Sequence, residues 1–218
     1  MNEIIPQWLK EVLNRGFKPK KTFYDFHDFA FGYINAKSAT TKRVARIYSL
    51  EGLPGSGKTS ILKYFSNGDK VLTVKQIFPA EPKFDQAMDQ SFYFNSDELK
   101  TSQCFNSDRI CLLDRYYSST LAFYWAYDKV HKSNTYKKAW DWYCNSLKGN
   151  KLIKPFTIIF IDIPADLSLS RKNRVASLKT NNLWQNKKFL EFFYEYYNYF
   201  YKKVEPQTNL IRIDGATS

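Results

Sequence analysis

The residues whose types and spacing point most directly to chemistry form one glycine-rich stretch. It reads Gly52-Leu53-Pro54-Gly55-Ser56-Gly57-Lys58-Thr59-Ser60, and residues 52–59 complete the pattern G-x-x-x-x-G-K-[ST]. Glycines let the backbone curl until its N–H groups converge on phosphate oxygens, and a helix behind such a loop directs its positive end at the same oxygens. We therefore predict that residues 52–60 bind ATP, with Lys58 reaching the β- and γ-phosphates and the Thr59 hydroxyl holding Mg²⁺.

Further charged side chains stand where apolar stretches end. They are Glu51, Glu81, the pair Asp114-Arg115, and Asp162. In an open parallel sheet, ligands gather at the carboxyl ends of the strands. The sequence therefore predicts that these side chains crowd around one phosphate site.

The elements that must position these residues are expected from the spacing of apolar side chains. Buried strands alternate with helices, which predicts an α/β fold with a five-stranded parallel sheet covered on both faces. The strands are expected at about 46–51, 70–77, 109–113, 157–163 and 210–214. The helices are expected at 6–15, at 85–103, at 119–147 with a break near Ser133-Asn134, from Asp166 to Arg174, and at 185–203.

Two regions divide the chain. Residues 1–45 are expected to form an N-terminal extension with one helix and a cluster of rings between 23 and 33. So many rings would not stay exposed, so the extension is expected to pack on the rest of the protein or to bind a partner. Residues 46–218 are expected to form one domain of the P-loop NTPase class.

The amino-acid composition limits the kinds of molecule that the protein is expected to bind. The formal charge of +12, from 33 Lys and Arg against 21 Asp and Glu, favours nucleotides or nucleic acid. The lysines are scattered and no tract interleaves them with aromatics, so nucleic acid is the weaker candidate. The three cysteines show no C-x-x-C spacing, which argues against a disulfide framework or a zinc site. With no apolar run of about 18 residues and no secretory signal pattern, we expect a cytoplasmic protein without a membrane span.

Taken together, the motifs resemble the thymidylate kinase-like nucleoside monophosphate kinases, with the deoxynucleoside kinases as close relatives. The resemblance covers the chain from about residue 46 to its end. It depends on the glycine-rich loop after Glu51, on Glu81-Pro82, on the D-R-Y stretch at 114–123, and on residues 161–174.

The resemblance implies a role for each matching residue. ATP and Mg²⁺ are the implied cofactors, with the metal held by Thr59 and Asp114. Arg115 should contact the phosphate of the acceptor, while Arg171 and Arg174 should close over the transferring phosphoryl group as part of a mobile lid at 165–185. The catalytic residues are thus expected to be Lys58, Asp114, Arg115, Arg171 and Arg174. The residues expected to bind the acceptor are Glu81, Arg115, Tyr116, Ser119, Phe123 and Tyr124.

Several positions depart from the family pattern, and all of them bear on the acceptor. Pro54 stands where a carboxylate is usual, Tyr124 replaces a glutamine, and the tyrosines at 194, 196 and 197 replace arginines of the late helix. The expected acceptor is a nucleoside monophosphate such as dTMP or a relative. The alternatives are a deoxynucleoside or another small molecule as acceptor, or a nucleotide-binding regulatory protein with this fold. A homodimer is left open.

Overall fold

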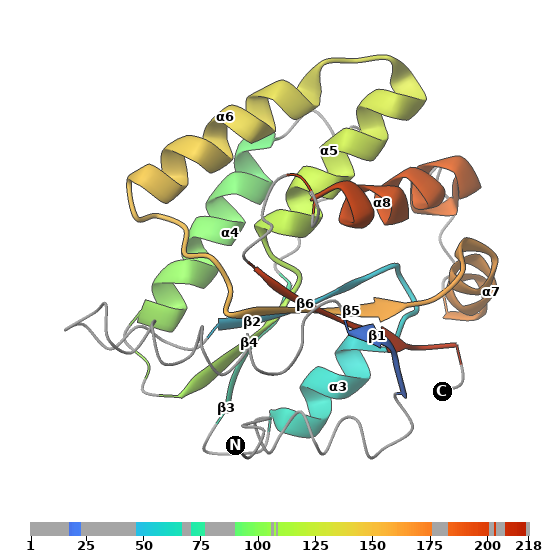
Figure 1. Ribbon diagram of the computed structural model, residues 1–218, viewed down its shortest axis with the longest axis horizontal. Coiled ribbons are helices and arrows are strands. Elements are labelled where there is room, and N and C mark those ends of the chain that lie inside the picture. The colour runs from blue at the N-terminus through green and yellow to red at the C-terminus, as the bar shows by residue number, and fades with distance from the viewer. Residues whose placement is uncertain are drawn as a thin grey trace.

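A six-stranded β-sheet is the centre of the part of the chain that the computed structural model describes (Figure 1). Described are residues 47–66, 71–76, 90–105, 107, 109–175, 183–200, 203 and 208–216, and the strand 18–22, with the backbone alone at 18–22, 173–175 and 209. The strand order is β1-β6-β5-β2-β4-β3. The strands span Lys18–Thr22 (β1), Ile47–Gly52 (β2), Val71–Val74 (β3), Ile110–Asp114 (β4), Thr157–Asp162 (β5) and Asn209–Asp214 (β6).

The five predicted strands are confirmed and run parallel to one another. The sixth strand, β1, pairs antiparallel with β6 and comes from the predicted N-terminal extension. Its sequence, Lys-Pro-Lys-Lys-Thr, lacks the apolar alternation from which a strand is predicted. Lysine and proline are typical of an edge strand, where they discourage pairing with another chain.

The helices lie on both faces of the sheet, as predicted (Figure 1). Among the described helices, α3 covers one face of the sheet, while α4, α5 and α8 cover the other. Helix α6 packs outside α4 and α5, and α7 lies at the end of the sheet. Their bounds are Lys58–Phe65 (α3), Gln90–Phe105 (α4), Tyr117–His131 (α5), Thr135–Lys148 (α6), Ala165–Val175 (α7) and Lys187–Tyr199 (α8), with a 3₁₀ turn, η1, at Leu183–Gln185. The predicted helix at 6–15 lies outside the described residues.

The predicted break near Ser133-Asn134 separates α5 from α6. Lys132 ends α5 in the left-handed conformation, with φ 53°. The carboxylate of Asp128 then accepts hydrogen bonds from the backbone N–H groups of Thr135 and Tyr136, both at 2.9 Å. These two N–H groups belong to the first turn of α6, where no carbonyl of the same helix can bind them. The Asp128 side chain of α5 therefore supplies the hydrogen-bond acceptors that the first N–H groups of α6 need.

Successive residues of the strands serve two separate cores. Ile47, Leu113 and Phe160 pack with the helices of one face, whereas Leu50 and Ile159 pack with α3 on the other. Glu51 follows the parity of Ile47, so its side chain is directed to the face covered by α5 and α8. This alternation decides on which side of the sheet a functional group of β2 can act.

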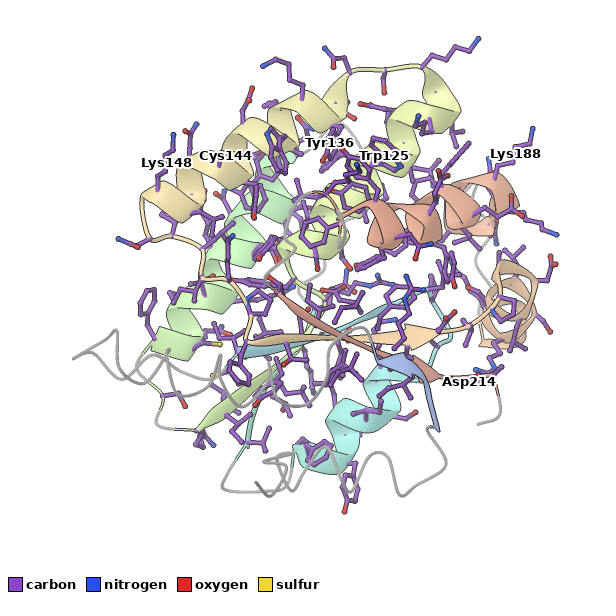
Figure 2. All side chains as sticks on the ribbon, viewed as in Figure 1. Trp125, Tyr136, Cys144, Lys148, Lys188 and Asp214 are labelled. Carbon is purple, nitrogen blue, oxygen red and sulfur yellow. The ribbon has the colours of Figure 1, made fainter. Side chains whose placement is uncertain are left out.

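Aromatic rings fill much of the larger core. Trp125 of α5 and Tyr136 of α6 lie beside each other with ring centroids 5.7 Å apart, whereas Lys148 and Lys188 point outward from the helical layer (Figure 2). The side chains of both lysines are exposed.

Among the described helices, none combines the length and the apolar character that a membrane span requires.

We expect Gly52→Ala to destabilise the fold. Gly52 has φ 133°, and an added Cβ would lie 2.4 Å from the carbonyl oxygen of Ile161 on the neighbouring strand. The backbone strain alone should lower the free energy of unfolding by about 1–3 kcal/mol, and the overlap adds to it. Urea denaturation measures the change. The control is Gly149→Ala, because Gly149 has φ −82° and its added Cβ would approach no atom closer than 3.3 Å. Equal stability of the two variants would contradict the expectation.

Candidate active site

The glycine-rich loop joins β2 to α3 and encloses the ammonium of Lys58. Gly55 and Gly57 have φ values of 73° and 101°, which bend the backbone around that group. The Nζ of Lys58 donates to the carbonyl oxygens of Gly52 (3.1 Å) and Leu53 (2.9 Å) and to Ser56 Oγ (3.0 Å). No side chain caps the N-terminus of α3, because Gly57 is the N-cap residue. A buried cation beside an uncapped helix N-terminus favours an anion as its neighbour.

Burial lowers the pKa of Lys58 well below its usual range, and the positive charge of Arg115 acts in the same direction. The negative charges of Asp114 and Glu51 oppose this shift. The loop, the corner after β4 and the end of β2 thus share one electrostatic environment. The structure brings Glu51, Lys58, Asp114 and Arg115 together, and their place at a phosphate site stays a prediction.

Glu51 is fully buried at the end of β2, and donors surround its carboxylate. Its Oε1 accepts from the Ser49 hydroxyl, from the Ser118 hydroxyl (2.7 Å) and from the backbone N–H of Tyr116 (3.0 Å). Its Oε2 accepts from the Ser119 hydroxyl and from Tyr197 OH (2.9 Å). The carboxylate therefore connects β2 with the start of α5 and with α8.

Asp114 and Arg115 form the corner at which β4 ends and α5 begins. Arg115 has φ 58°, an uncommon conformation for a residue other than glycine, and its N–H donates to the carbonyl oxygen of Leu50 at 3.1 Å. Its guanidinium donates to Ser119 Oγ at 3.2 Å and lies over the rings of Trp184 and Phe193, at 5.1 Å and 5.5 Å from their centroids. Rings on one side and a hydroxyl on the other hold the charge in a fixed place.

The residues predicted to hold Mg²⁺ fit such an ion. The Thr59 hydroxyl is exposed in the first turn of α3, and Asp114 Oδ1 is buried without a hydrogen-bond partner in the described part of the chain. An unpaired carboxylate oxygen is costly to bury unless it meets a cation or a donor. Mg²⁺ needs only one or two protein oxygens when phosphates supply the others. No group of three His, Cys, Asp or Glu side chains gathers among the described residues.

The predicted lid is described in part. Helix α7 begins it and η1 ends it, whereas residues 176–182 and the side chain of Arg174 lie outside the described residues. Arg171 Nη1 donates to the carbonyl oxygens of Gly55 (3.3 Å) and Gly215 (2.8 Å), and Nη2 donates to that of Ala216 (3.3 Å). Arg171 thereby ties α7 to the glycine-rich loop and to the turn after β6. Its contact with a transferring phosphoryl group stays a prediction, as does the mobility of the lid.

Lys172 belongs to the predicted lid, but the sequence analysis assigned it no role at the site. Burial lowers the pKa of Lys172 to about 8, and the positive charge of Arg115 contributes to the shift. Lys172 therefore lies close enough to Arg115 for their charges to repel each other. The signal that could have found it is its place beside Arg171 at the end of α7.

The predicted acceptor residues fall into two groups. Ser119 lies beside the Arg115 guanidinium, and Phe123 contacts Trp184 with ring centroids 5.7 Å apart. Tyr116 points elsewhere, because its hydroxyl contacts Thr101 Oγ1 and accepts from the backbone N–H of Ile153 at 3.3 Å. Tyr124 is fully buried against Phe94 and Phe123. The acceptor roles of Tyr116 and Tyr124 stay predictions, and Glu81 lies outside the described residues.

The carboxylate of Asp162 takes part in an ion pair, and its predicted place at the phosphate site stays a prediction. Its Oδ2 lies 3.6 Å from Arg212 Nη1 and accepts a hydrogen bond from Tyr194 OH at 3.2 Å. Arg212 stands beside it because β5 and β6 pair in parallel, and the guanidinium also lies 5.0 Å from the centroid of Phe160. The carboxylate is therefore occupied by a buried ion pair under α8.

Comparisons with known proteins identify solved structures with a similar fold. No protein-family model and no curated protein matches the chain. Among solved structures, deoxyadenosine kinase from M. mycoides with bound dATP matches with a TM-score of 0.64 and 18% identity, over 78% of this chain and 92% of that chain. The same kinase with dCMP and dCDP matches with a TM-score of 0.62 and 15% identity, over 79% of this chain and 92% of that one. Its complex with dCTP matches with a TM-score of 0.58 and 20% identity, over the same shares.

The chain has the α/β fold of these P-loop kinases. At such identities the likeness establishes the fold alone, and the predicted fold class is confirmed. The structural neighbour is a deoxyadenosine kinase, and the sequence analysis named the deoxynucleoside kinases beside the thymidylate kinase-like enzymes. The position of the glycine-rich loop between a central parallel strand and its helix agrees with this fold.

We expect Glu51→Gln to destabilise the protein. The amide would turn an NH₂ group toward hydroxyl and N–H donors that now bind a carboxylate, and buried donors would lose their acceptor. The free energy of unfolding should fall by about 1–3 kcal/mol. Glu191→Gln serves as the control, because Glu191 is exposed on α8. Urea denaturation of both variants compares them, and a Glu51 variant as stable as the control would show that the buried carboxylate is not needed.

Proposed function

We propose that the protein is an ATP-dependent kinase that transfers a phosphoryl group to a hydroxyl of a deoxynucleoside. The supporting observation is the convergence of three residues: Lys58 in the loop, Asp114 at the end of β4 and Arg115 in the corner before α5. The backbone N–H groups of Arg115 and Tyr116 donate to Leu50 O (3.1 Å) and to Glu51 (3.0 Å), so hydrogen bonds tie this corner to the end of β2, and the charges of Asp114 and Arg115 act on Lys58. A cation enclosed by a phosphate-binding loop, an unpaired carboxylate oxygen and a fixed guanidinium are what phosphoryl transfer requires.

The residues of this chain have separate tasks in the proposed reaction. The loop and the start of α3 bind the phosphates of ATP, with Lys58 beside the β- and γ-phosphates. Thr59 and Asp114 would hold Mg²⁺, which neutralises charge on those phosphates. Arg115 stabilises charge on the transferring group or contacts the acceptor, because Ser119 and two rings fix its guanidinium near the loop. Catalysis then consists of positioning and electrostatic stabilisation.

Rings near Arg115 suit a planar base. Phe123 lies nearly parallel to Tyr93 and to Tyr127, with interplanar angles of 28° and 15°, and it also contacts Trp184. Aromatic surfaces stack well on a nucleobase but discriminate weakly between bases. We therefore expect a broader preference for the base than a site with an amide in place of Tyr124 would show.

A second candidate acceptor is a nucleoside monophosphate, the acceptor favoured by the sequence. The observation in its favour is Lys172, because two cations side by side could share an acceptor phosphate that Arg115 alone would bind less well. The two candidates differ by one phosphate group, so the same assay separates them.

The function is tested by measuring ADP release with ATP and a panel of nucleosides, deoxynucleosides and their monophosphates. We expect turnover with at least one deoxynucleoside, and a loss of about 10²–10³-fold in kcat for Lys58→Ala because a preorganised cation is removed. The control is Lys63→Ala, since Lys63 is exposed on the same helix.

Each result of the panel has a distinct meaning. Turnover with monophosphates only would favour the second candidate. Binding of ATP without turnover on any acceptor would favour a regulatory protein. Undiminished turnover by the Lys58→Ala variant would contradict the kinase proposal altogether.

ATP binding is expected to weaken as the pH rises through about 8. An anion near Lys172 favours the charged ammonium and raises its pKa, which lies at about 8 in the free protein, so binding takes up a proton. Lys172→Arg should remove part of this pH dependence, because arginine stays charged. Calorimetric titration with ATP at pH 7 and pH 9 measures it, with Lys188→Arg as an exposed control. The same pH dependence in the Lys172 variant would exclude the role of Lys172.

A further inference from the structure

A buried ion pair of α4 lies directly behind the corner formed by Asp114 and Arg115. Lys100 and Asp97 are each 2% exposed, and Lys100 Nζ lies 3.2 Å from Asp97 Oδ1. The same ammonium donates to the carbonyl oxygens of Arg115 (3.1 Å) and Asp114 (3.4 Å). The three partners match the three N–H groups of an ammonium, so Asp97 and the corner together use its hydrogen-bonding capacity.

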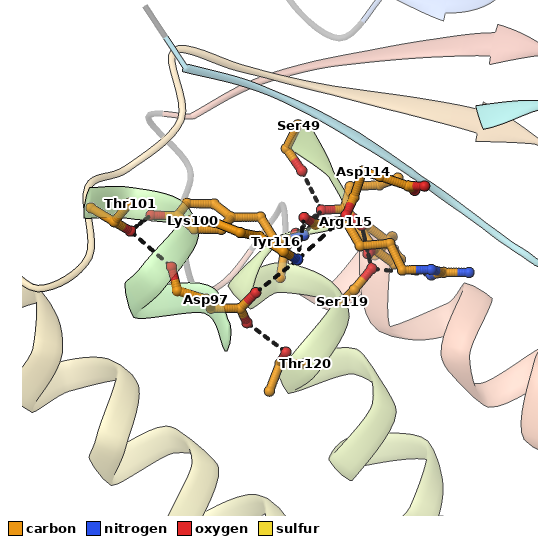
Figure 3. Close-up of polar contacts among 12 residues, drawn as sticks. Ser49, Asp97, Lys100, Thr101, Asp114, Arg115, Tyr116, Ser119 and Thr120 are labelled. Atoms are coloured by element: carbon orange, nitrogen blue, oxygen red, sulfur yellow. Dashed lines mark hydrogen bonds and ion pairs between the residues drawn. The ribbon is translucent and has the colours of Figure 1, made fainter. Parts of the chain in front are cut away.

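Asp97 is itself fixed by contacts with α5 and with its own helix. Its Oδ2 accepts from the Thr120 hydroxyl of α5 at 2.6 Å. Thr101 donates to the Asp97 carbonyl oxygen at 3.0 Å and contacts the hydroxyl of Tyr116. Lys100 thus approaches the corner from one side, whereas the Arg115 guanidinium points away on the other (Figure 3). The pair touches the backbone of the corner and leaves its functional side chains free to face the loop.

The corner needs such support because Arg115 is in the left-handed region, with φ 58°. For a residue with a long side chain this conformation is strained, and it persists only where the surroundings fix it. The N–H of Arg115 is held by Leu50 O at 3.1 Å, and the carbonyl oxygen is held by Lys100. Hydrogen bonds therefore fix the peptide groups on both sides of the strained Cα atom.

Stability alone does not explain a buried ion pair here. Apolar residues of similar volume often match or exceed the stability of such a pair, because two buried charges lose their hydration. An apolar side chain could fill the same space, but it could not donate to two carbonyl oxygens. The charged pair therefore supplies what an apolar pair lacks: hydrogen bonds that fix the conformation of residues 114–115.

We propose that Lys100, oriented by Asp97, is a positioning residue that holds Arg115 in the left-handed turn and so directs Asp114 and Arg115 toward the glycine-rich loop. Lys100 touches no substrate in this scheme and acts through the backbone of the corner. The expected effect of Lys100 on catalysis rests on the proposed kinase function. Its expected effect on the backbone conformation of Arg115 does not.

The test uses the double variant Asp97→Leu/Lys100→Met, which removes both charges and leaves no buried carboxylate unpaired. We expect a urea midpoint close to that of the wild-type protein, a fall of about 10–100-fold in kcat because misplaced groups react slowly, and less than a threefold change in the dissociation constant of ATP. Lys100→Met alone should be clearly less stable, since it leaves Asp97 unpaired. Lys151→Met is the matched control, because Lys151 pairs with Glu98 of the same helix at 3.5 Å but is exposed.

A crystal structure of the double variant decides the backbone part directly. We expect Arg115 to leave the left-handed region there. A left-handed Arg115, or a wild-type kcat in the double variant, would overturn the proposal. If the wild-type protein turns over no acceptor, the kinase proposal fails, and the φ angle of Arg115 in the double variant still decides whether Lys100 positions the corner.

Discussion

The buried carboxylate of Glu51 is the interaction on which the arrangement of the site depends. A carboxylate can be buried only if donors replace its water, and here they come from β2, from the first turn of α5 and from α8. The glycine-rich loop begins one residue after Glu51, and Arg115 lies directly before Tyr116, whose N–H binds the same carboxylate. The loop and the Arg115 corner therefore share one anchor, and neither can shift without breaking contacts of the other.

Around this anchor the fold brings like charges together. Arg115 acts on both Lys58 and Lys172, and the lowered pKa values of the two lysines express the cost of placing them in a buried environment beside this cation. Glu51 and Asp114 offset part of this repulsion at Lys58. An anion that enters such a site meets charges already in place, which is the physical basis of electrostatic preorganisation. Trp184 and Phe193 add a constraint on direction, because their rings limit where the guanidinium can turn.

The sequence predicts the local features of this design well. The G-x-x-x-x-G-K-[ST] pattern and the apolar strands depend on neighbouring residues only, and the structure confirms both the loop and the five parallel strands. What the sequence does not predict are contacts between distant segments. Lys100 is indistinguishable in the sequence from an exposed lysine, because a pair with Asp97 three residues earlier is equally common on a helix surface. The partner that α4 meets, the corner after β4, becomes evident only in three dimensions.

Asp162 shows the same limit from the opposite side. Its place at the end of an apolar strand predicts a role at the phosphate site. The sequence gives no sign that the Asp162 carboxylate pairs with Arg212 of the adjacent strand. Tyr194 of α8 takes part in this ion pair, since its hydroxyl binds both Asp162 and Arg212.

Helix α8 has no arginine in its sequence and reaches the site through the ring of Phe193 and the hydroxyl of Tyr197, which support Arg115 and Glu51. An acceptor phosphate would have to be neutralised by Arg115 or by cations of the lid such as Lys172, because α8 supplies no guanidinium. A deoxynucleoside makes no such demand, and this difference supports the proposal of a deoxynucleoside as the acceptor.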